Sequence, residues 1–223
     1  AAASGAVPVA NPAFAEGMMS SIKAGISALP DTVDGAMILP VDVPLVRAST
    51  LARIAECAGS GNAAVVRPTF RGRSGHPPFV RRQLFAEILA APPETTLRDV
   101  IERHQDEAQS VAVIDSGIVR DMDYPDDYRH LAAALPHRLH PDAAECEAML
   151  DAAGTPEPTR RHSRVVAQLA VDIATRLTAK ANRVQVDARL ATNLDDFATA
   201  SLDAIVSNPP FHRGVAKDSE PAM

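Results

Sequence analysis

The feature that most constrains this chain is the alternation of short apolar segments with amphipathic segments over residues 6–135. The apolar segments have the composition of buried strands; they cover residues 6–11, 35–46, 62–70 and 110–115. Such alternation is typical of an α/β domain with helices on both faces of a mainly parallel sheet. We predict a three-layer sandwich with an incomplete, Rossmann-like sheet, in which strands near 36–42, 63–68 and 110–115 lie side by side.

The predicted helices between these strands have apolar residues at three- and four-residue spacing. They cover residues 17–29, 49–59, 80–91, 96–105 and 123–135. After a proline-flanked break, two further helices are expected at 142–153 and 160–180. The sequence therefore predicts three parts, which are an α/β domain (1–135), a helical segment (136–181) and a tail (182–223).

Composition excludes several classes of protein. The net charge of −6 argues against a general nucleic-acid-binding surface, which would be basic. No stretch has the roughly 18 apolar residues of a membrane span, and the first residues lack the pattern of a signal peptide. Cys57 and Cys146 have no metal or redox spacing. We expect a cytoplasmic protein with reduced cysteines and no membrane partner.

Asp42 stands inside the apolar segment "ILPVDVPLV" (38–46), between Pro40 and Pro44. This segment predicts a strand buried on both faces, where a lone carboxylate is costly unless its charge is compensated. Ligands of open α/β sheets bind at the carboxyl ends of the strands. Asp42 and a carboxylate of the acidic segment 121–127 would therefore hold Mg²⁺ together with a nucleoside triphosphate. The alternative is that Asp42 stabilises a turn through its side chain.

Four segments occur in a fixed order: "NPAFAEGMMSSIKAGI", "ILPVDVPLV", "RPTFRGRSGHPPFV" and "GIVRDMDYPDDY". Together they resemble the MobA-like nucleotidyltransferases, specifically the molybdenum-cofactor cytidylyltransferase type, over residues 6–135. The resemblance implies transfer of a nucleoside monophosphate from CTP or GTP to a pterin phosphate, with Mg²⁺ as cofactor and pyrophosphate as the second product. Catalysis would rest on positioning and charge neutralisation.

The resemblance also implies roles for individual residues. Asp42 matches the metal-binding acidic residue of that family, and Asp123 matches a second acidic group on the metal side, so both are candidate catalytic residues. The positions that match parts of the substrate pocket are Ser20, Ser21, Gly75, His76 and Pro77. The glycine-rich nucleotide-binding loop with which the family begins has no match in this sequence. A non-catalytic fragment or binding module of the same fold is therefore the alternative interpretation.

The second half of the chain carries two shorter resemblances. The segment "PEPTRRHSRVVAQLAVDIATRL" resembles the first helix of HD-type metal phosphohydrolases, with His162 at a metal-ligand position. Since the sequence contains no His-Asp dipeptide, we predict that His162 holds no metal.

The tail segment "LDAIVSNPPFHRG" (202–214) resembles the Asn-Pro-Pro-Phe motif of methyltransferases that act on exocyclic amines. In that interpretation, Asn208 and the Pro209 carbonyl accept hydrogen bonds from the amine and Phe211 stacks on the base. The implied activity is S-adenosylmethionine-dependent methylation of RNA. The one Gly-x-Gly of the chain, Gly59–Gly61, lies between a helix and a strand, which is the wrong context for binding that cofactor.

Overall fold

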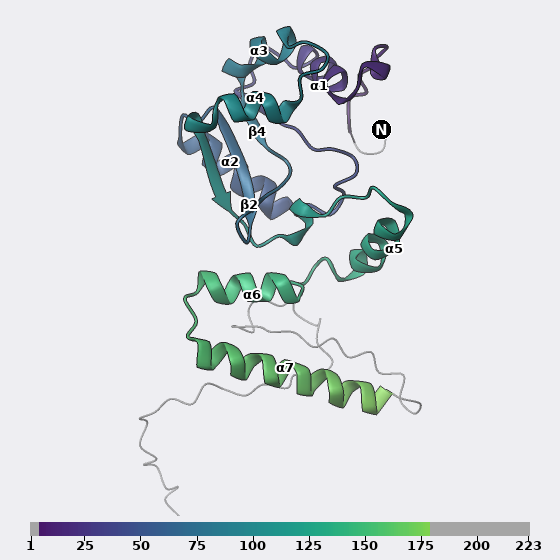
Figure 1. Ribbon diagram of the computed structural model, residues 1–223, viewed down its shortest axis with the longest axis vertical. Coiled ribbons are helices and arrows are strands. Elements are labelled where there is room, and N and C mark those ends of the chain that lie inside the picture. Colours follow the sequence, from purple (N-terminus) through teal and green to yellow (C-terminus); the bar gives the residue numbers. More distant parts are fainter. Residues whose placement is uncertain (1–4, 179–223) are drawn as a thin grey trace, which may run out of the picture. The chain divides into compact units, whose positions relative to one another are not determined.

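The computed structural model describes residues 5–178. The chain forms two compact units, Ala1–Met149 and Leu150–Met223. Both contain helices, and the sheet of the described residues belongs to the first unit (Figure 1).

The sheet has five strands: β1 (Gly35–Met37), β2 (Val65–Phe70), β3 (Arg73–Ser74), β4 (Phe79–Arg81) and β5 (Ala108–Ala112). β4 lies antiparallel between β1 and β2, β5 pairs in parallel with β2, and β3 forms a hairpin with β2. β1, β2 and β5 therefore run in the same direction. Because β4 separates β1 from β2, the three predicted strands share one sheet, but only the second and third are neighbours.

Seven α-helices lie within the described residues: α1 (Met18–Ser27), α2 (Ala48–Ser60), α3 (Phe85–Ala90), α4 (Leu97–Arg103), α5 (Pro125–Ala134), α6 (Ala143–Ala152) and α7 (Glu157–Thr178). Short 3-10 turns connect several of them: η2 (Phe14–Glu16), η3 (Arg82–Leu84), η4 (Gln105–Glu107), η5 (Ser116–Val119) and η6 (Leu135–His137).

Two separate apolar cores cover the two faces of the sheet. On one face, α1, α3 and α4 pack on the side chains of Val65 and Val80. On the other face, α2 packs on Val66, Phe79 and Val111. Consecutive residues of β2 and of β4 point to opposite faces, as the pleat of a strand requires. The structure therefore confirms the predicted α/β sandwich, although the sheet is mixed: only β2 and β5 pair in parallel, and the other three pairings are antiparallel.

Three predicted elements are wrong. Residues 6–11 form no strand, and Val7 is 85% exposed. The segment 38–46 is not a strand, because β1 ends at Met37 and the chain turns at 41–42, beside prolines that cannot donate to a sheet. The helix predicted at 80–91 is β4 followed by η3 and α3.

A buried network of charged groups joins three distant segments of the first unit. Asp115 accepts hydrogen bonds from the backbone N–H of Arg47 and the hydroxyl of Thr50, and it is paired with Arg138. Glu145 pairs with both Arg47 and Arg138. The segment that follows α5 is thereby fixed to the start of α2 and the end of β5. The domain boundary expected at residue 135 stays a prediction.

In the second unit, α7 has helical spacing of apolar residues, as the sequence predicts. Val165 and Leu169 on this helix are 61% and 57% exposed. Among residues 5–178, no helix combines the length and the apolar character that crossing a membrane requires.

Candidate functional site

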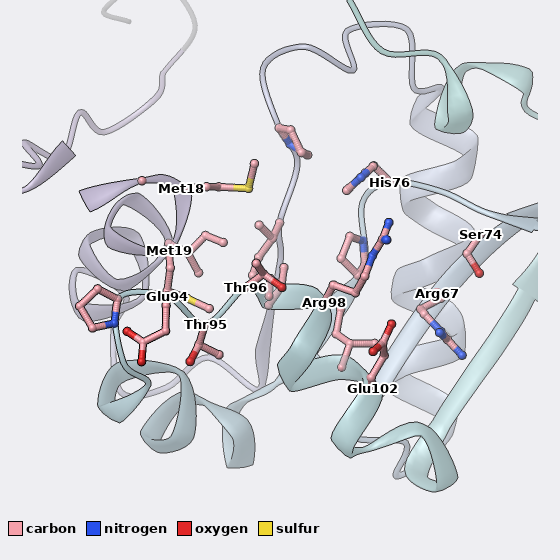
Figure 2. Close-up of a pocket in the computed structure, with 18 of the residues that line it drawn as sticks. Met18, Met19, Arg67, Ser74, His76, Glu94, Thr95, Thr96, Arg98 and Glu102 are labelled. Carbon is pink, nitrogen blue, oxygen red and sulfur yellow. The ribbon is translucent and has the colours of Figure 1, made fainter. Parts of the chain in front are cut away.

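A cavity of about 660 Å³ opens in the first unit beside the sheet. It is lined by the start of α1, the segment after β1, the middle of β2, the loop that joins β3 to β4, and residues 93–102 of α4 and the turn before it. Figure 2 places Met18 and Met19 at one end of the cavity and Arg67, Ser74 and His76 at the other. The cavity thus has a basic end and an opposite end where the two methionines lie with Glu94 and Thr95 (Figure 2).

The polar end of the cavity exists because β2 changes partners along its length. β2 pairs with β4 at Val65 and Val66 and with β3 at Thr69 and Phe70, so Arg67 lies where neither strand pairs with it. On its other side β2 is paired continuously with β5. The interruption leaves room for the loop that carries His76.

Two backbone hydrogen bonds fix this loop. The N–H of Gly75 donates to the Pro68 carbonyl at 2.9 Å, and the N–H of His76 donates to the Ile118 carbonyl at 2.8 Å. A Cβ on Gly75 would lie 2.3 Å from the Ile118 oxygen, so only glycine fits. The peptide bond between His76 and Pro77 is cis. The close approach of the loop to Ile118 sets the position of His76.

The start of α4 brings Thr96 and Arg98 to the cavity. Thr96 accepts a hydrogen bond from the N–H of Asp99, and the Asp99 carboxylate accepts from the N–H of Thr96. This reciprocal capping satisfies two backbone donors and fixes where the helix begins. Arg98 follows two residues after the cap, on the first turn.

Asp42 is half-buried in the turn after β1. Its Oδ1 atom is buried and has no hydrogen-bond partner within the described residues. A turn-stabilising carboxylate would accept a backbone N–H through this oxygen. This oxygen makes no such bond within the described residues, so a donor or a cation from outside them would be needed to compensate its charge.

His76 connects Asp42 to the cavity electrostatically. Burial lowers the pKa of His76 below its ordinary value, and the charge of Arg98 lowers it further, while the charges of Asp42 and Asp121 oppose this shift. His76 Nδ1 is also buried without a hydrogen-bond partner in the part of the chain described. The two unpartnered atoms therefore belong to residues that lie close enough for their charges to interact.

The remaining predicted residues lie in different surroundings. Asp123 is exposed. Within the acidic segment 121–127, the residue whose charge acts on the pKa of His76 is Asp121. Ser20 and Ser21 accept hydrogen bonds from the Asn11 amide at 2.8 and 2.9 Å. Neither serine lines the cavity.

Gly75 and His76 line the cavity, whereas Pro77 is buried and does not line it. Within residues 5–178, no group of three or more histidine, cysteine, aspartate or glutamate side chains is arranged to hold a metal ion. His162 is exposed on the first turns of α7, and its lack of a metal stays a prediction. Asn208, Pro209 and Phe211 lie outside the described residues.

Sequence reasoning missed Arg67, Arg98 and Asp121. Arg67 is the first residue of the segment "RPTF". No pattern in the sequence indicates that the pairing of β2 is interrupted at Arg67, between the parts that pair with β4 and with β3. Arg98 and Glu102 are four residues apart on a predicted helix, and this spacing is typical of an ordinary pair of opposite charges on a helix surface. Asp121 is one of four acidic residues within 121–127, and spacing alone cannot choose among them.

Comparisons with known families give two matches. Residues 1–108 match the MobA-like NTP transferase domain. Residues 162–222 match the methyltransferase small domain. Among curated proteins, none matches this chain.

Several solved structures resemble the chain. The crystal structure of the Rv0371c homologue from Mycobacterium sp. strain JC1 is 24% identical, with a TM-score of 0.46 over 54% of this chain and 59% of that chain. A structure of Rv0371c from Mycobacterium tuberculosis H37Rv is 22% identical, with a TM-score of 0.46 over 52% of this chain and 59% of its own. A second Rv0371c structure from that organism, described as a complex with manganese, is also 22% identical, with a TM-score of 0.44 over 50% of this chain and 58% of its own. The chain thus spans less than two thirds of the length of these proteins.

Proposed function

We propose that the first unit is a nucleotidyltransferase domain of the molybdenum-cofactor type. It would transfer a nucleoside monophosphate from CTP or GTP to a pterin phosphate. An oxygen of the pterin phosphate forms a bond to the α-phosphorus, the bond from that phosphorus to the oxygen bridging to the β-phosphorus breaks, and pyrophosphate leaves with the electron pair. The match of residues 1–108 to the MobA-like NTP transferase domain supports the reaction class.

The observation that carries this proposal is the unpartnered Oδ1 of Asp42. A buried carboxylate oxygen without a donor costs free energy, and a cation beside it would offset that cost. Mg²⁺ fits this oxygen, because Mg²⁺ is commonly bound by only one or two carboxylates and completes its octahedron with phosphates and waters. When bound, it supplies charge neutralisation at the triphosphate.

The other residues of the site would bind and orient the acceptor. Asp42 does not itself line the cavity, but His76 does, and the charge of Asp42 acts on the pKa of His76. The cavity volume of about 660 Å³ is in the range of pockets that bind small molecules. An acceptor held there would present its phosphate to a nucleotide bound near Asp42.

A transfer assay tests the proposal. The chain is incubated with α-labelled CTP or GTP, the pterin phosphate and Mg²⁺, and labelled pterin dinucleotide and pyrophosphate are measured. We expect both products with one of the two nucleotides, none in EDTA, and none with Asp42→Asn. Asp106→Asn is the matched control, because Asp106 is exposed and does not line the cavity. Mg²⁺-dependent binding of a nucleotide without any turnover would instead support a binding module of the same fold.

A second candidate function concerns the other end of the chain. The match of residues 162–222 to the methyltransferase small domain favours S-adenosylmethionine-dependent methylation of RNA. Asn208, Pro209 and Phe211 would then bind the target base. Equilibrium titration with S-adenosylmethionine tests this, and a chain that fails to bind it contradicts the methyltransferase proposal.

A further inference from the structure

Arg67 differs from Arg47, whose Nε is also buried. In the described part of the chain, both arginines have a buried Nε atom without a hydrogen-bond partner. The guanidinium of Arg47 pairs with Glu145. Within residues 5–178, Arg67 has no such carboxylate partner. A guanidinium that is partly desolvated and uncompensated favours an anion from outside the chain.

Because Arg67 lines the cavity, an anion bound to its guanidinium would lie at the cavity. Arg67 lines the cavity from the middle of β2, at the interruption between β3 and β4. Ser74 and His76 line the same end (Figure 2). Arg98 also lines the cavity and has no ion pair within the described residues. Guanidinium groups can donate two parallel hydrogen bonds to phosphate oxygens, which suits them to a phosphate monoester.

The apolar side chains of the cavity suit an apolar body. Met18 and Met19 lie at the end opposite to Arg67, where Glu94 and Thr95 also lie (Figure 2). Ile22 and Ile101 line the cavity as well, and Met19, Ile22 and Ile101 are largely buried in the first core. Met18 is 63% exposed, so its flexible side chain is available to cover a ligand. A ligand with a phosphate at one end and an apolar body at the other matches this arrangement.

Acidic groups on the cavity limit the attraction for anions. Glu16, Glu94 and Glu102 line it, and all three are exposed, so water and salt screen their charges. Glu102 lies near the basic end in Figure 2. Its carboxylate opposes a bound phosphate without pairing to either arginine in the described structure.

We propose that Arg67, assisted by Arg98, binds the phosphate of a phosphate monoester whose apolar body lies against Met18, Met19 and Ile101. This deepens the proposed function, since it gives the residues that would hold the acceptor's phosphate. The binding needs neither a nucleotide nor a metal. Its failure is therefore distinguishable from failure of Mg²⁺-dependent nucleotide binding at Asp42.

The test uses phenyl phosphate as the probe, titrated into the full chain in EDTA and followed by backbone amide resonances. We expect shifts centred on Ser74 and Thr96, with phenyl phosphate binding more tightly than inorganic phosphate and phenol not binding. Arg67→Gln should weaken phenyl phosphate binding by about tenfold or more, the usual loss for a hydrogen bond to a charged group. Arg98→Gln should weaken it less, because Arg98 is exposed.

Two further variants make the test specific. Arg73→Gln removes the same charge from exposed β3 without touching the cavity, so the affinity should change less than about twofold. Glu102→Gln should raise the affinity, because it removes an opposing charge. Equal losses in Arg67→Gln and Arg73→Gln, or shifts away from Ser74 and Thr96, would overturn the proposal. If Arg67→Gln does not fold, the other two variants test the proposal. Arg98→Gln should then lower the affinity for phenyl phosphate and Glu102→Gln should raise it. An unchanged affinity in both variants refutes the proposal.

Discussion

Glu145 is fully buried, and its Oε1 accepts a 2.8 Å hydrogen bond from Nη1 of Arg138. The same oxygen accepts from the N–H of Ser116 at 2.8 Å, and Oε2 accepts from Arg47 at 2.7 Å. Arg138 also pairs with Asp115, whose side chain is 1% exposed. Each buried charge of this network therefore has several partners, which is the condition for burying charges without a large loss of stability.

Removing Arg138 should destabilise the first unit strongly. Arg138→Gln leaves the carboxylates of Asp115 and Glu145 buried with one cation fewer. Breaking one side of a buried pair costs about 3 kcal/mol or more. Urea unfolding measures the change in the free energy of unfolding.

Arg129→Gln is the matched control for Arg138→Gln. Arg129 pairs with Asp126 on the surface of α5, and both side chains are more than 70% exposed. The expected change is below about 0.5 kcal/mol. Similar losses in the two variants would show that the buried network does not stabilise the unit.

His104 should make stability depend on pH. Its ring bonds to Glu87 at 2.6 Å and to Glu107 at 3.3 Å, and these bonds raise the pKa of His104 above its ordinary value of 6.5. The same bond from His104 lowers the pKa of Glu87 below its ordinary value of 4.5.

The raised pKa of His104 gives stability that is complete below pH 6.5 and is lost as the pH rises through the folded value. The lowered pKa of Glu87 gives stability that is complete above pH 4.5 and is lost as the pH falls through the folded value. The difference in melting temperature between the wild type and His104→Gln should thus be largest between pH 4.5 and 6.5. A difference that stays constant up to pH 9 would contradict this assignment.

Substitution by alanine should lower the stability of the fold at Gly75 and raise it at Gly59. A Cβ at Gly75 would lie 2.3 Å from the backbone oxygen of Ile118, so Gly75→Ala must displace the loop that carries His76. The expected loss is about 1–3 kcal/mol, as for other overpacked sites. Gly59 lies inside α2, where a Cβ would have no atom within 4 Å, and Gly59→Ala should stabilise by about 0.5–1 kcal/mol. Thermal unfolding distinguishes the two, and a loss in both would refute the account of this loop.

The sequence predicted the layers of the fold because they depend on local patterns. Met19, Ile22 and Ile26 have helical spacing and form the buried face of α1. The order of the strands could not be predicted, because β4 has three residues and its pairing is with segments far away in the chain. The apolar residues of 38–46 misled the strand prediction: Val43 and Leu45 are buried, but in irregular chain with turns, and Val41 is 92% exposed.

The candidate site was predictable only in part. Asp42 and His76 were both singled out, and the charge of Asp42 does act on His76. The metal-side role of Asp123 stays a prediction, because the acidic segment follows η5 and its direction depends on how that turn packs. The cavity itself is a product of tertiary packing, so no local pattern revealed that Arg67 would line it.

The central claim is that Asp42 holds a divalent cation for a nucleotide, and calorimetric titration with CTP and GTP tests it most directly. The wild-type chain should bind one of them in Mg²⁺ and lose that binding in EDTA. Asp42→Asn should bind equally weakly in both conditions while remaining as stable as the wild type or more so, because a buried uncompensated charge is removed. Asp106→Asn should behave as the wild type. Unfolding of Asp42→Asn, or Mg²⁺-dependent binding that this variant retains, would contradict the account and leave Asp42 as a structural turn residue.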